Sequence, residues 1–135
     1  MTHNVRFTTE TAHVKESLHG HSIRWAVSID DGDDDSFLTS ETVYQKLLPF
    51  FRRYDKAVVV YEHDPIAKLF MWYGAFGHMP SVIMDSVPSG ANLAKHMAHI
   101  VSLVFPEYRV SVSVQMTDSA SWTYTIGRNN DTGAE

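Results

Sequence analysis

The chain has 135 residues, of which 44% are apolar and 20% charged, with a formal net charge of −5 and no cysteine. This length and composition indicate one globular domain, which we place at residues 1–127, with a disordered tail at 128–135. The lack of cysteine excludes disulfides, thiolate metal sites and a cysteine nucleophile. Negative charge argues against a nucleic-acid partner, and no apolar run reaches the ~20 residues of a membrane span. Because the N-terminus also lacks a signal-peptide core, we expect a cytoplasmic protein.

The first predicted elements are two strands with alternating apolar residues. Odd-numbered positions from Val5 to His13 share one face, and odd-numbered positions from His19 to Ile29 do the same. Period-2 alternation of this kind is typical of half-buried antiparallel strands. The five residues between the strands, 14–18, have the length of a hairpin loop.

Helical spacing of apolar residues replaces this alternation in two later segments, residues 40–54 and 92–105. Two short pieces that lie between them, 57–62 and 81–88, have an extended character. Alternation then returns near the C-terminus. The last two predicted strands are 108–116 and 121–127.

The simplest arrangement of these elements is an α+β domain with a four-stranded antiparallel sheet and both helices on one face. The two extended pieces are left outside the sheet in this prediction.

Three of the eight histidines are predicted to converge at one end of the first hairpin. His19 and His21 are two residues apart on a strand, so their side chains point the same way. His13 ends the preceding strand on the same inward face. Three imidazoles can hold zinc and leave its fourth position open. The alternative is that these are buried histidines, hydrogen-bonded to the backbone.

Five segments, in chain order, are similar to motifs of the 6-pyruvoyltetrahydropterin and 6-carboxytetrahydropterin synthases, from about Val5 to Tyr124. The segments are FTTETAH, HGHSIR, YDKAVVVYEHDPIAKL, VPSGANLAKHM and VSVQMTDSASWTY. This resemblance implies the tunnelling fold (T-fold), in which subunits close their sheets into a barrel, and hence a homo-oligomer, a trimer or hexamer.

The resemblance also implies a zinc ion and a small-molecule, pterin-like substrate. It assigns the zinc to His13, His19 and His21, and it places Ser89 in the substrate-binding motif. Dihydroneopterin triphosphate or a related reduced pterin is the implied substrate, within the 7-deazapurine (queuosine) pathway or the pterin and folate pathway.

Several family residues are replaced in this chain. Glu16 stands in the stretch of the catalytic cysteine, at the spacing of a subgroup that carries glutamate there. Asp55 is kept from the Asp-His pair of the family, but Lys56 replaces the histidine. Met116 stands where the family has the glutamate that anchors the pterin ring. Asp118 could replace that glutamate only if the strand carries a bulge.

The catalytic candidates are therefore Glu16, Asp55 and Lys56. Glu16 can serve as the base if an apolar site raises its pKa, or it can be a solvated loop residue. Lys56 can bind phosphate as a fixed charge, or it can be an ordinary surface lysine. His96 and His99, three apart on the second helix, are given no role.

Two classes of function follow from these residues. The first is a zinc-dependent lyase acting on a reduced pterin, which the three zinc ligands favour. The second is a zinc-bearing paralogue without catalytic activity, or an enzyme with a changed substrate, which the loss of the anchoring glutamate favours.

Overall fold

The computed structural model describes residues 1–15, 17–32, 38–67, 80–117 and 120–127, and gives only the backbone for residues 15, 17–19 and 117. The expected disordered tail, 128–135, lies outside these ranges. The elements in chain order are β1 (Thr2–Lys15), β2 (Ser17–Asp30), α1 (Ser40–Arg52), β3 (Ala57–Tyr61), β4 (Ser81–Met84), α3 (Gly90–Val104), β5 (Arg109–Thr117) and β6 (Ala120–Ile126). No helix in the described ranges is long and apolar enough to cross a membrane.

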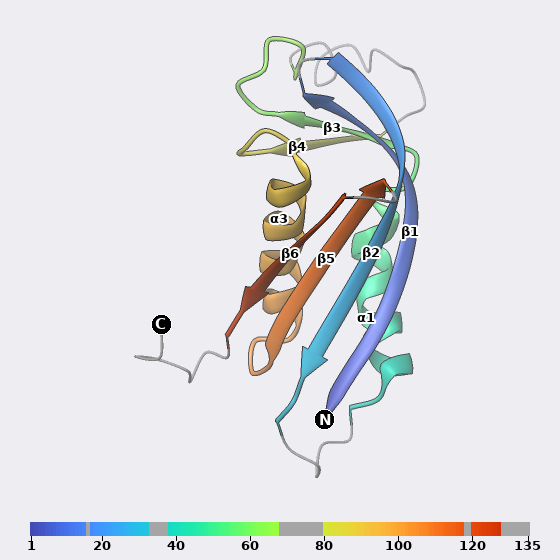
Figure 1. Ribbon diagram of the computed structural model, residues 1–135, viewed down its shortest axis with the longest axis vertical. Coiled ribbons are helices and arrows are strands. Elements are labelled where there is room, and N and C mark those ends of the chain that lie inside the picture. Colours follow the sequence, from blue (N-terminus) through green and yellow to red (C-terminus); the bar gives the residue numbers. More distant parts are fainter. Residues whose placement is uncertain (16, 33–37, 68–79, 118–119, 128–135) are drawn as a thin grey trace.

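The strands form one six-stranded mixed sheet in the order β4-β3-β1-β2-β5-β6. The predicted four-stranded antiparallel sheet is wrong, because the two short extended pieces join it as β3 and β4. Strand β3 runs parallel to β1 and to β4, whereas the other neighbours are antiparallel. The α+β class and the placement of two helices against the sheet are retained (Figure 1).

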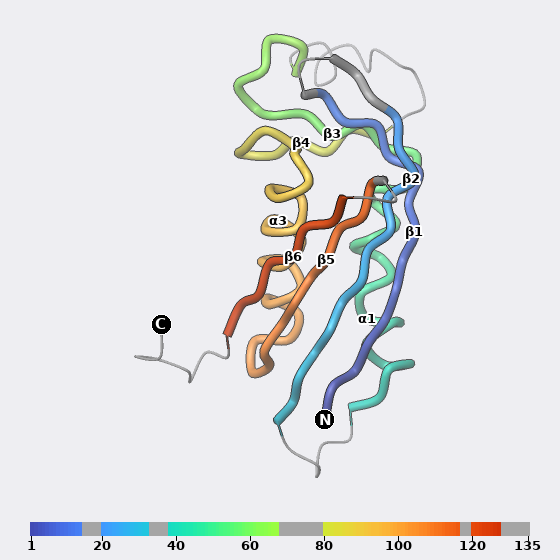
Figure 2. Tube along the Cα trace, in the orientation of Figure 1, coloured from blue at the N-terminus to red at the C-terminus, as the bar shows by residue number. Residues whose placement is uncertain are grey.

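Strands β1 and β2 form a long hairpin that runs the length of the molecule and curves (Figure 2). Their pairing extends from Thr2 opposite Asp30 to Lys15 opposite Ser17. The predicted five-residue loop at 14–18 is therefore wrong, since both strands continue through most of it. One end of the hairpin pairs with β5, and the other end pairs with β3.

The main core lies between the helices and one face of the sheet. Odd-numbered residues of β2 and even-numbered residues of β5 are buried there, as their alternation predicts. Helix α1 packs on β1, and helix α3 packs on β5 and β6. The side chains with almost no exposure in this core include Trp25, Ile29, Leu47, Phe51, Leu93, Met97 and Val112.

A second, smaller apolar cluster covers the opposite face of the sheet near β3. It contains Val14, Val58, Val60 and Ala67. Because Ala57 and Val59 face the main core, β3 is buried on both faces. Parallel strands covered on both faces have continuous apolar sequences, as in AVVV. This is why alternation did not reveal β3 as a member of the sheet.

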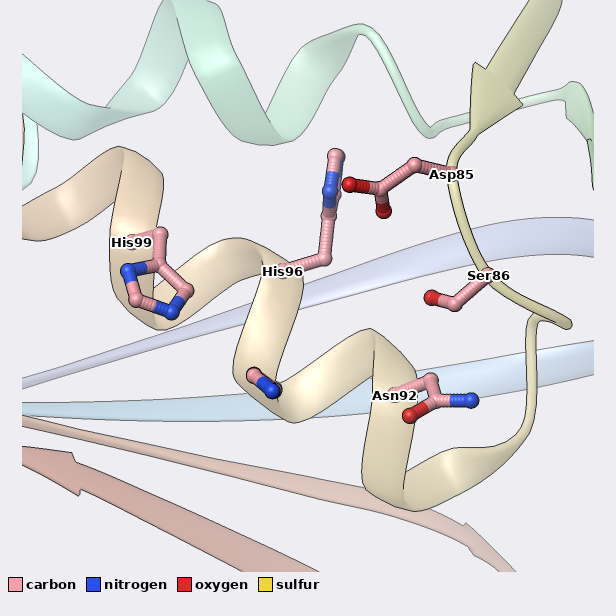
Figure 3. A pocket seen from close by; sticks show the side chains of 6 residues that line it. Asp85, Ser86, Asn92, His96 and His99 are labelled. Atoms are coloured by element: carbon pink, nitrogen blue, oxygen red, sulfur yellow. The ribbon is translucent and has the colours of Figure 1, made fainter. Parts of the chain in front are cut away.

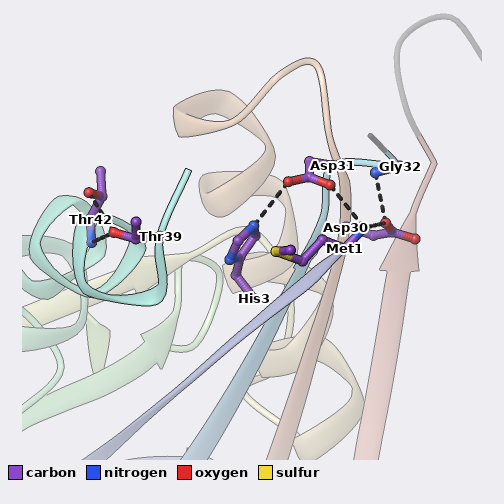
Figure 4. Close-up of polar contacts among 7 residues, drawn as sticks. All are labelled: Met1, His3, Asp30, Asp31, Gly32, Thr39 and Thr42. Atoms are coloured by element: carbon purple, nitrogen blue, oxygen red, sulfur yellow. Dashed lines mark hydrogen bonds and ion pairs between the residues drawn. The ribbon is translucent and has the colours of Figure 1, made fainter. Parts of the chain in front are cut away.

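A buried histidine–aspartate pair closes the end of the hairpin that is far from the three-histidine cluster. His3 Nε2 lies 3.0 Å from Asp31 Oδ2, and both side chains are almost fully buried (Figure 4). The backbone N–H of Gly32 donates to Asp30 Oδ1 over 2.9 Å and tightens the following turn. His3 therefore serves the fold and lies outside the predicted metal site.

Candidate metal centre

The register of the β1–β2 hairpin brings the three predicted zinc ligands to one place. His13 lies directly opposite His19, and His21 lies opposite Thr11, two residues from His13. In an antiparallel pair, directly opposite and diagonal residues on one face are the nearest side-chain neighbours. The backbone thus puts all three positions on the same face, as the sequence predicted.

His13 is buried and held in a defined orientation. Its Nδ1 lies 2.7 Å from the backbone oxygen of Pro88, just before helix α3. Since a carbonyl oxygen only accepts, Nδ1 carries the proton, and in the neutral ring Nε2 carries the lone pair. Metal-binding histidines are commonly oriented in this way, by donating the second ring N–H to a backbone carbonyl.

The rings of His13 and His21 have a separation that suits one shared metal ion. Their centroids are 5.0 Å apart, with 50° between the ring planes. Two imidazoles bound to a tetrahedral zinc at about 2.1 Å place their centroids roughly 5 Å apart. The side chain of His19 lies outside the described residues, and no group of three possible ligands occurs among the side chains that are described. The ring separation of His13 and His21 is thus compatible with a shared metal ion, and their role as zinc ligands stays a prediction.

Beneath this cluster runs a chain of buried polar contacts that sequence reasoning missed. The indole N–H of Trp25 donates to Thr9 Oγ1 over 2.9 Å, and Thr9 Oγ1 lies 2.8 Å from Thr11 Oγ1. The Thr11 hydroxyl then donates to the backbone oxygen of Tyr54 over 2.7 Å. These contacts attach β1, two residues before His13, to the turn that precedes β3. No sequence pattern marks the contacts of Trp25 with Thr9 and of Thr11 with Tyr54, because these partners are 16 and 43 residues apart in the chain.

Tyr54 has a second polar contact, from its side chain. Its hydroxyl lies 2.8 Å from His96 Nε2 on helix α3. Burial raises the pKa of the Tyr54 hydroxyl to about 12, against a smaller lowering by Arg53. The phenol is therefore neutral at physiological pH, and its contact with His96 joins the turn before β3 to helix α3.

Asp55 and Lys56 complete the turn and hold the edge of β1. The Asp55 carboxylate accepts from the backbone N–H of Glu10 over 2.9 Å, and the Lys56 N–H donates to Glu10 O over 2.6 Å. Lys56 has a φ of 57°, in the left-handed region that costs a residue with a Cβ about 1–2 kcal/mol. Asp55 has a structural use in these contacts, and its catalytic role stays a prediction.

Lys56 and His21 line the same cleft of about 400 Å³, on the edge of the hairpin. Glu10 and Ser22 also line it, and the Ser22 hydroxyl binds the Glu10 carboxylate. The cleft is floored by Ala12 and Gly20, whose small size leaves space there. Glu10, Ala12, Gly20 and Ser22 are at even-numbered positions, so the cleft opens on the face of the hairpin opposite the inward side chains of His13 and His21. Lys56 therefore shares this cleft with the His21 position, but not the face that carries the predicted zinc ligands.

The two predicted substrate-binding residues, Ser89 and Met116, lie on different elements. Ser89 is the N-cap of α3, where its hydroxyl accepts from Asn92 N, and it follows the Pro88 that orients His13. Met116 packs partly buried against the main core, beside a shift of register between Gln115 and Thr117. A bulge therefore occurs where Asp118 would need one. Asp118 and Glu16 themselves lie outside the described residues.

The arrangement of elements is similar to that of solved enzymes. A 6-pyruvoyltetrahydropterin synthase variant of Plasmodium vivax superposes with a TM-score of 0.67, over 94% of this chain and 99% of the other, at 10% identity. The Plasmodium falciparum 6-pyruvoyl tetrahydropterin synthase gives 0.65 over 93% and 98%, also at 10% identity. The chain has the fold of the 6-pyruvoyltetrahydropterin synthases. The expected T-fold is therefore confirmed as the fold of the chain.

This fold also occurs in an uncharacterised protein of Wolinella succinogenes, with a TM-score of 0.51 and 12% identity over 94% of this chain and 98% of the other. No protein-family model and no curated protein matches the sequence. At such identities the likeness establishes the fold, and the chemistry must be argued from the residues.

Proposed function

We propose that the protein is a divergent, zinc-dependent lyase of the 6-pyruvoyl- and 6-carboxytetrahydropterin synthase type. Its substrate would be dihydroneopterin triphosphate or a related reduced pterin, and His13, His19 and His21 would hold the zinc. The observation that carries the proposal is the pair of rings at 5.0 Å, with His13 oriented by Pro88 O, in this fold.

The residues around the proposed zinc have separate tasks. When bound, zinc would polarise the side-chain oxygens of the substrate and ease removal of a carbon-bound proton. Lys56 offers a fixed positive charge for phosphate, at a cleft on the face of the hairpin opposite the proposed zinc. Glu16 would remove the proton. Two Plasmodium vivax structures are variants in which a catalytic glutamate is replaced, which supports a glutamate as the catalytic group in this fold.

Metal analysis of the purified protein tests the zinc site. We expect about one zinc per chain after dialysis, and loss of that zinc in His13→Ala and His21→Ala. His63→Ala is the matched control, since His63 is exposed and its described contacts are with Glu62, at 3.3 Å, and with the ring of Tyr61. Zinc content that is equal in all three variants would rule out the site.

Incubation with dihydroneopterin triphosphate and zinc, with products identified by mass spectrometry, tests the reaction. Glu16→Gln should abolish turnover and leave the zinc content unchanged, because it removes a titratable group at constant size. Glu107→Gln, an exposed glutamate in the turn after α3, should behave as wild type. Full activity in Glu16→Gln would mean that a residue other than Glu16 acts as the base.

A second function, a paralogue without this activity or with a changed substrate, is favoured by Met116. A thioether cannot pair with the ring donors of a pterin, and each buried donor left unpaired costs about 1–3 kcal/mol. Calorimetry with neopterin separates the two functions. Weak wild-type binding that Met116→Glu tightens supports a pterin pocket, whereas no binding by either form supports the second function.

The open edges of the sheet support a homo-oligomer, a trimer or hexamer. Among the described residues, β1 pairs with β3 only at Thr11–His13, and β6 has a strand on one side only. An unpaired strand edge presents N–H and C=O groups that can pair with another chain. Sedimentation should therefore give a multiple of 15.3 kDa, and a value near that mass itself would contradict the assembly.

A further inference from the structure

The outer face of α3 borders a polar cleft whose lining does not include the three histidines of the predicted zinc site. Asn92, Lys95, His96 and His99 share this face, because their spacing of three and four residues follows the helical repeat. Asp85 and Ser86, which follow β4, line the same cleft, which has a volume of about 380 Å³. Figure 3 shows the Asp85 carboxylate beside the His96 ring. Clefts of this size accommodate small ligands.

Each basic side chain of this cleft is held by a tyrosine. His96 Nε2 lies 2.8 Å from the Tyr54 hydroxyl, on the turn before β3. The Lys95 ammonium lies 5.9 Å from the ring centroid of Tyr124 on β6, and the His99 ring lies 5.8 Å from the same ring. Side chains held in this way lose less entropy when a ligand binds.

Neutral donors also border the cleft and are themselves positioned. The Asn92 amide donates one hydrogen to Val87 O over 2.9 Å, which fixes the amide and leaves its second hydrogen for another acceptor. Ser86 adds a hydroxyl. The lining therefore offers an ammonium, two imidazoles, an amide and a hydroxyl, against the single carboxylate of Asp85.

This donor set selects the chemical class of the ligand. A metal ion is a poor fit, because the described residues contain no group of three possible ligands. A tetrahedral oxyanion can accept from several donors at once, and charge-assisted hydrogen bonds are the strong ones. The concentration of basic groups also contrasts with the net charge of −5 for the whole chain.

We propose that the cleft between α3 and the β4–α3 connection binds the phosphate group of a small phosphorylated ligand, with Lys95, His96 and His99 as the charge-bearing groups. The proposal is independent of the zinc site and of the proposed reaction. Asp85, whose carboxylate is directed toward the His96 ring in Figure 3, is then placed to hold His96 in its protonated form or to accept from a ligand hydroxyl.

Binding should be coupled to protonation of His96. In the free protein, burial lowers the pKa of His96, Asp85 raises it, and Arg53 and His99 lower it further. Tyr54 faces the ring as a neutral phenol, and Lys95 lies beside it on α3. An oxyanion favours the protonated imidazole, so affinity should fall as the pH rises through the pKa of His96.

Titration with sulfate, followed through the histidine ring signals by NMR, tests the proposal, because the charge of sulfate is constant from about pH 6 to about pH 8. We expect saturable shifts of His96 and His99 and weaker binding at the higher pH. Lys95→Met should weaken binding roughly tenfold, as loss of a charge-assisted contact implies. Lys46→Met is the matched control, since Lys46 also lies over an aromatic ring, that of Phe105, outside the cleft.

Methyl phosphate and acetate complete the experiment. Methyl phosphate should bind as sulfate does, and acetate should bind more weakly. Equal affinities in wild type, Lys95→Met and Lys46→Met would show general charge attraction and overturn the site. Acetate binding as tightly as sulfate would overturn the phosphate assignment, and the absence of saturable shifts at His96 and His99 would overturn both.

Discussion

The two ends of the sheet follow different rules of burial. At one end, β2, β5 and β6 are antiparallel, and the helices cover one face, so apolar and polar residues alternate along β2 and β5. At the other end, β3 lies parallel between β1 and β4, and Ala57 to Val60 are buried on both faces. The hairpin β1–β2 belongs to both ends.

The difference shows where a metal site can be built in such a sheet. The antiparallel end is filled by apolar side chains and packs without a ligand. At the parallel end, His13 and His21 occupy inward positions where apolar residues stand elsewhere on the hairpin. A zinc ion held by His13 and His21, as proposed, would stabilise the end of the sheet where they lie. We therefore expect the parallel end to depend on zinc and the antiparallel end to be independent of it.

Removal of zinc should have the largest effect and should act on one end only. With free zinc a thousand times above its dissociation constant, chelation removes about 4 kcal/mol of stabilisation. Hydrogen exchange should accelerate at Thr11–His13 and at their partners in β3, whereas Val110–Val114 in β5 should keep their protection unless unfolding becomes global. Equal acceleration at both ends would show that they unfold as one unit.

Alkaline pH should weaken the junction between the two ends. The pKa of Tyr54 is raised from 10.0 to about 12, so its contribution is complete below pH 10 and is lost as the pH rises through 12. A shift of this size corresponds to about 2–3 kcal/mol. Urea denaturation as a function of pH measures the loss.

Tyr54→Phe is the control for this titration. It removes the hydroxyl that contacts His96, which should cost about 1 kcal/mol at neutral pH, but it should flatten the alkaline decline. A decline equally steep in Tyr54→Phe would assign the alkaline loss to another group.

Gly90→Ala tests the packing at the antiparallel end. A Cβ on Gly90 would lie 2.2 Å from the ring of Trp122, so the indole must move. We expect a loss of about 1–3 kcal/mol in the free energy of unfolding, as for other overpacked sites. The double variant Gly90→Ala/Trp122→Ala should lose less than the two single changes added together.

Gly20→Ala is the matched change at the parallel end. A Cβ there meets no atom within 4 Å, and the residue is not among those with positive φ. We expect a change within about 0.5 kcal/mol. A larger loss of unfolding free energy in Gly20→Ala than in Gly90→Ala would mean that the parallel end is the more tightly packed of the two.

Lys56→Gly should have a modest effect of the opposite sign. Glycine adopts the φ of 57° without steric cost, so the free energy of unfolding should rise by about 1 kcal/mol. If the lysine serves the proposed reaction, turnover should fall while stability rises. Lower stability in Lys56→Gly would mean that the lysine side chain itself holds the turn.

Sequence reasoning placed the three histidine positions on one face of the hairpin, but it did not predict the six-stranded sheet around them. The spacing of His19 and His21, with His13 across the hairpin, placed all three positions on one face because alternation is a local property. The contacts that orient and support the site were not predictable. Pro88 O is 75 residues from His13 along the chain, and no pattern in the sequence joins them.

The sequence by itself determined which residues face inward on β1, β2 and β5, where α1 and α3 form, and that three histidines share a face. These properties depend on the repeat of the backbone within one element. Only the tertiary structure decided that β3 and β4 join the sheet in parallel, that Tyr54 bridges to His96, and that Gly90 lies under Trp122. Such pairings depend on the closure of long chain segments and on burial from both sides, which no local period records.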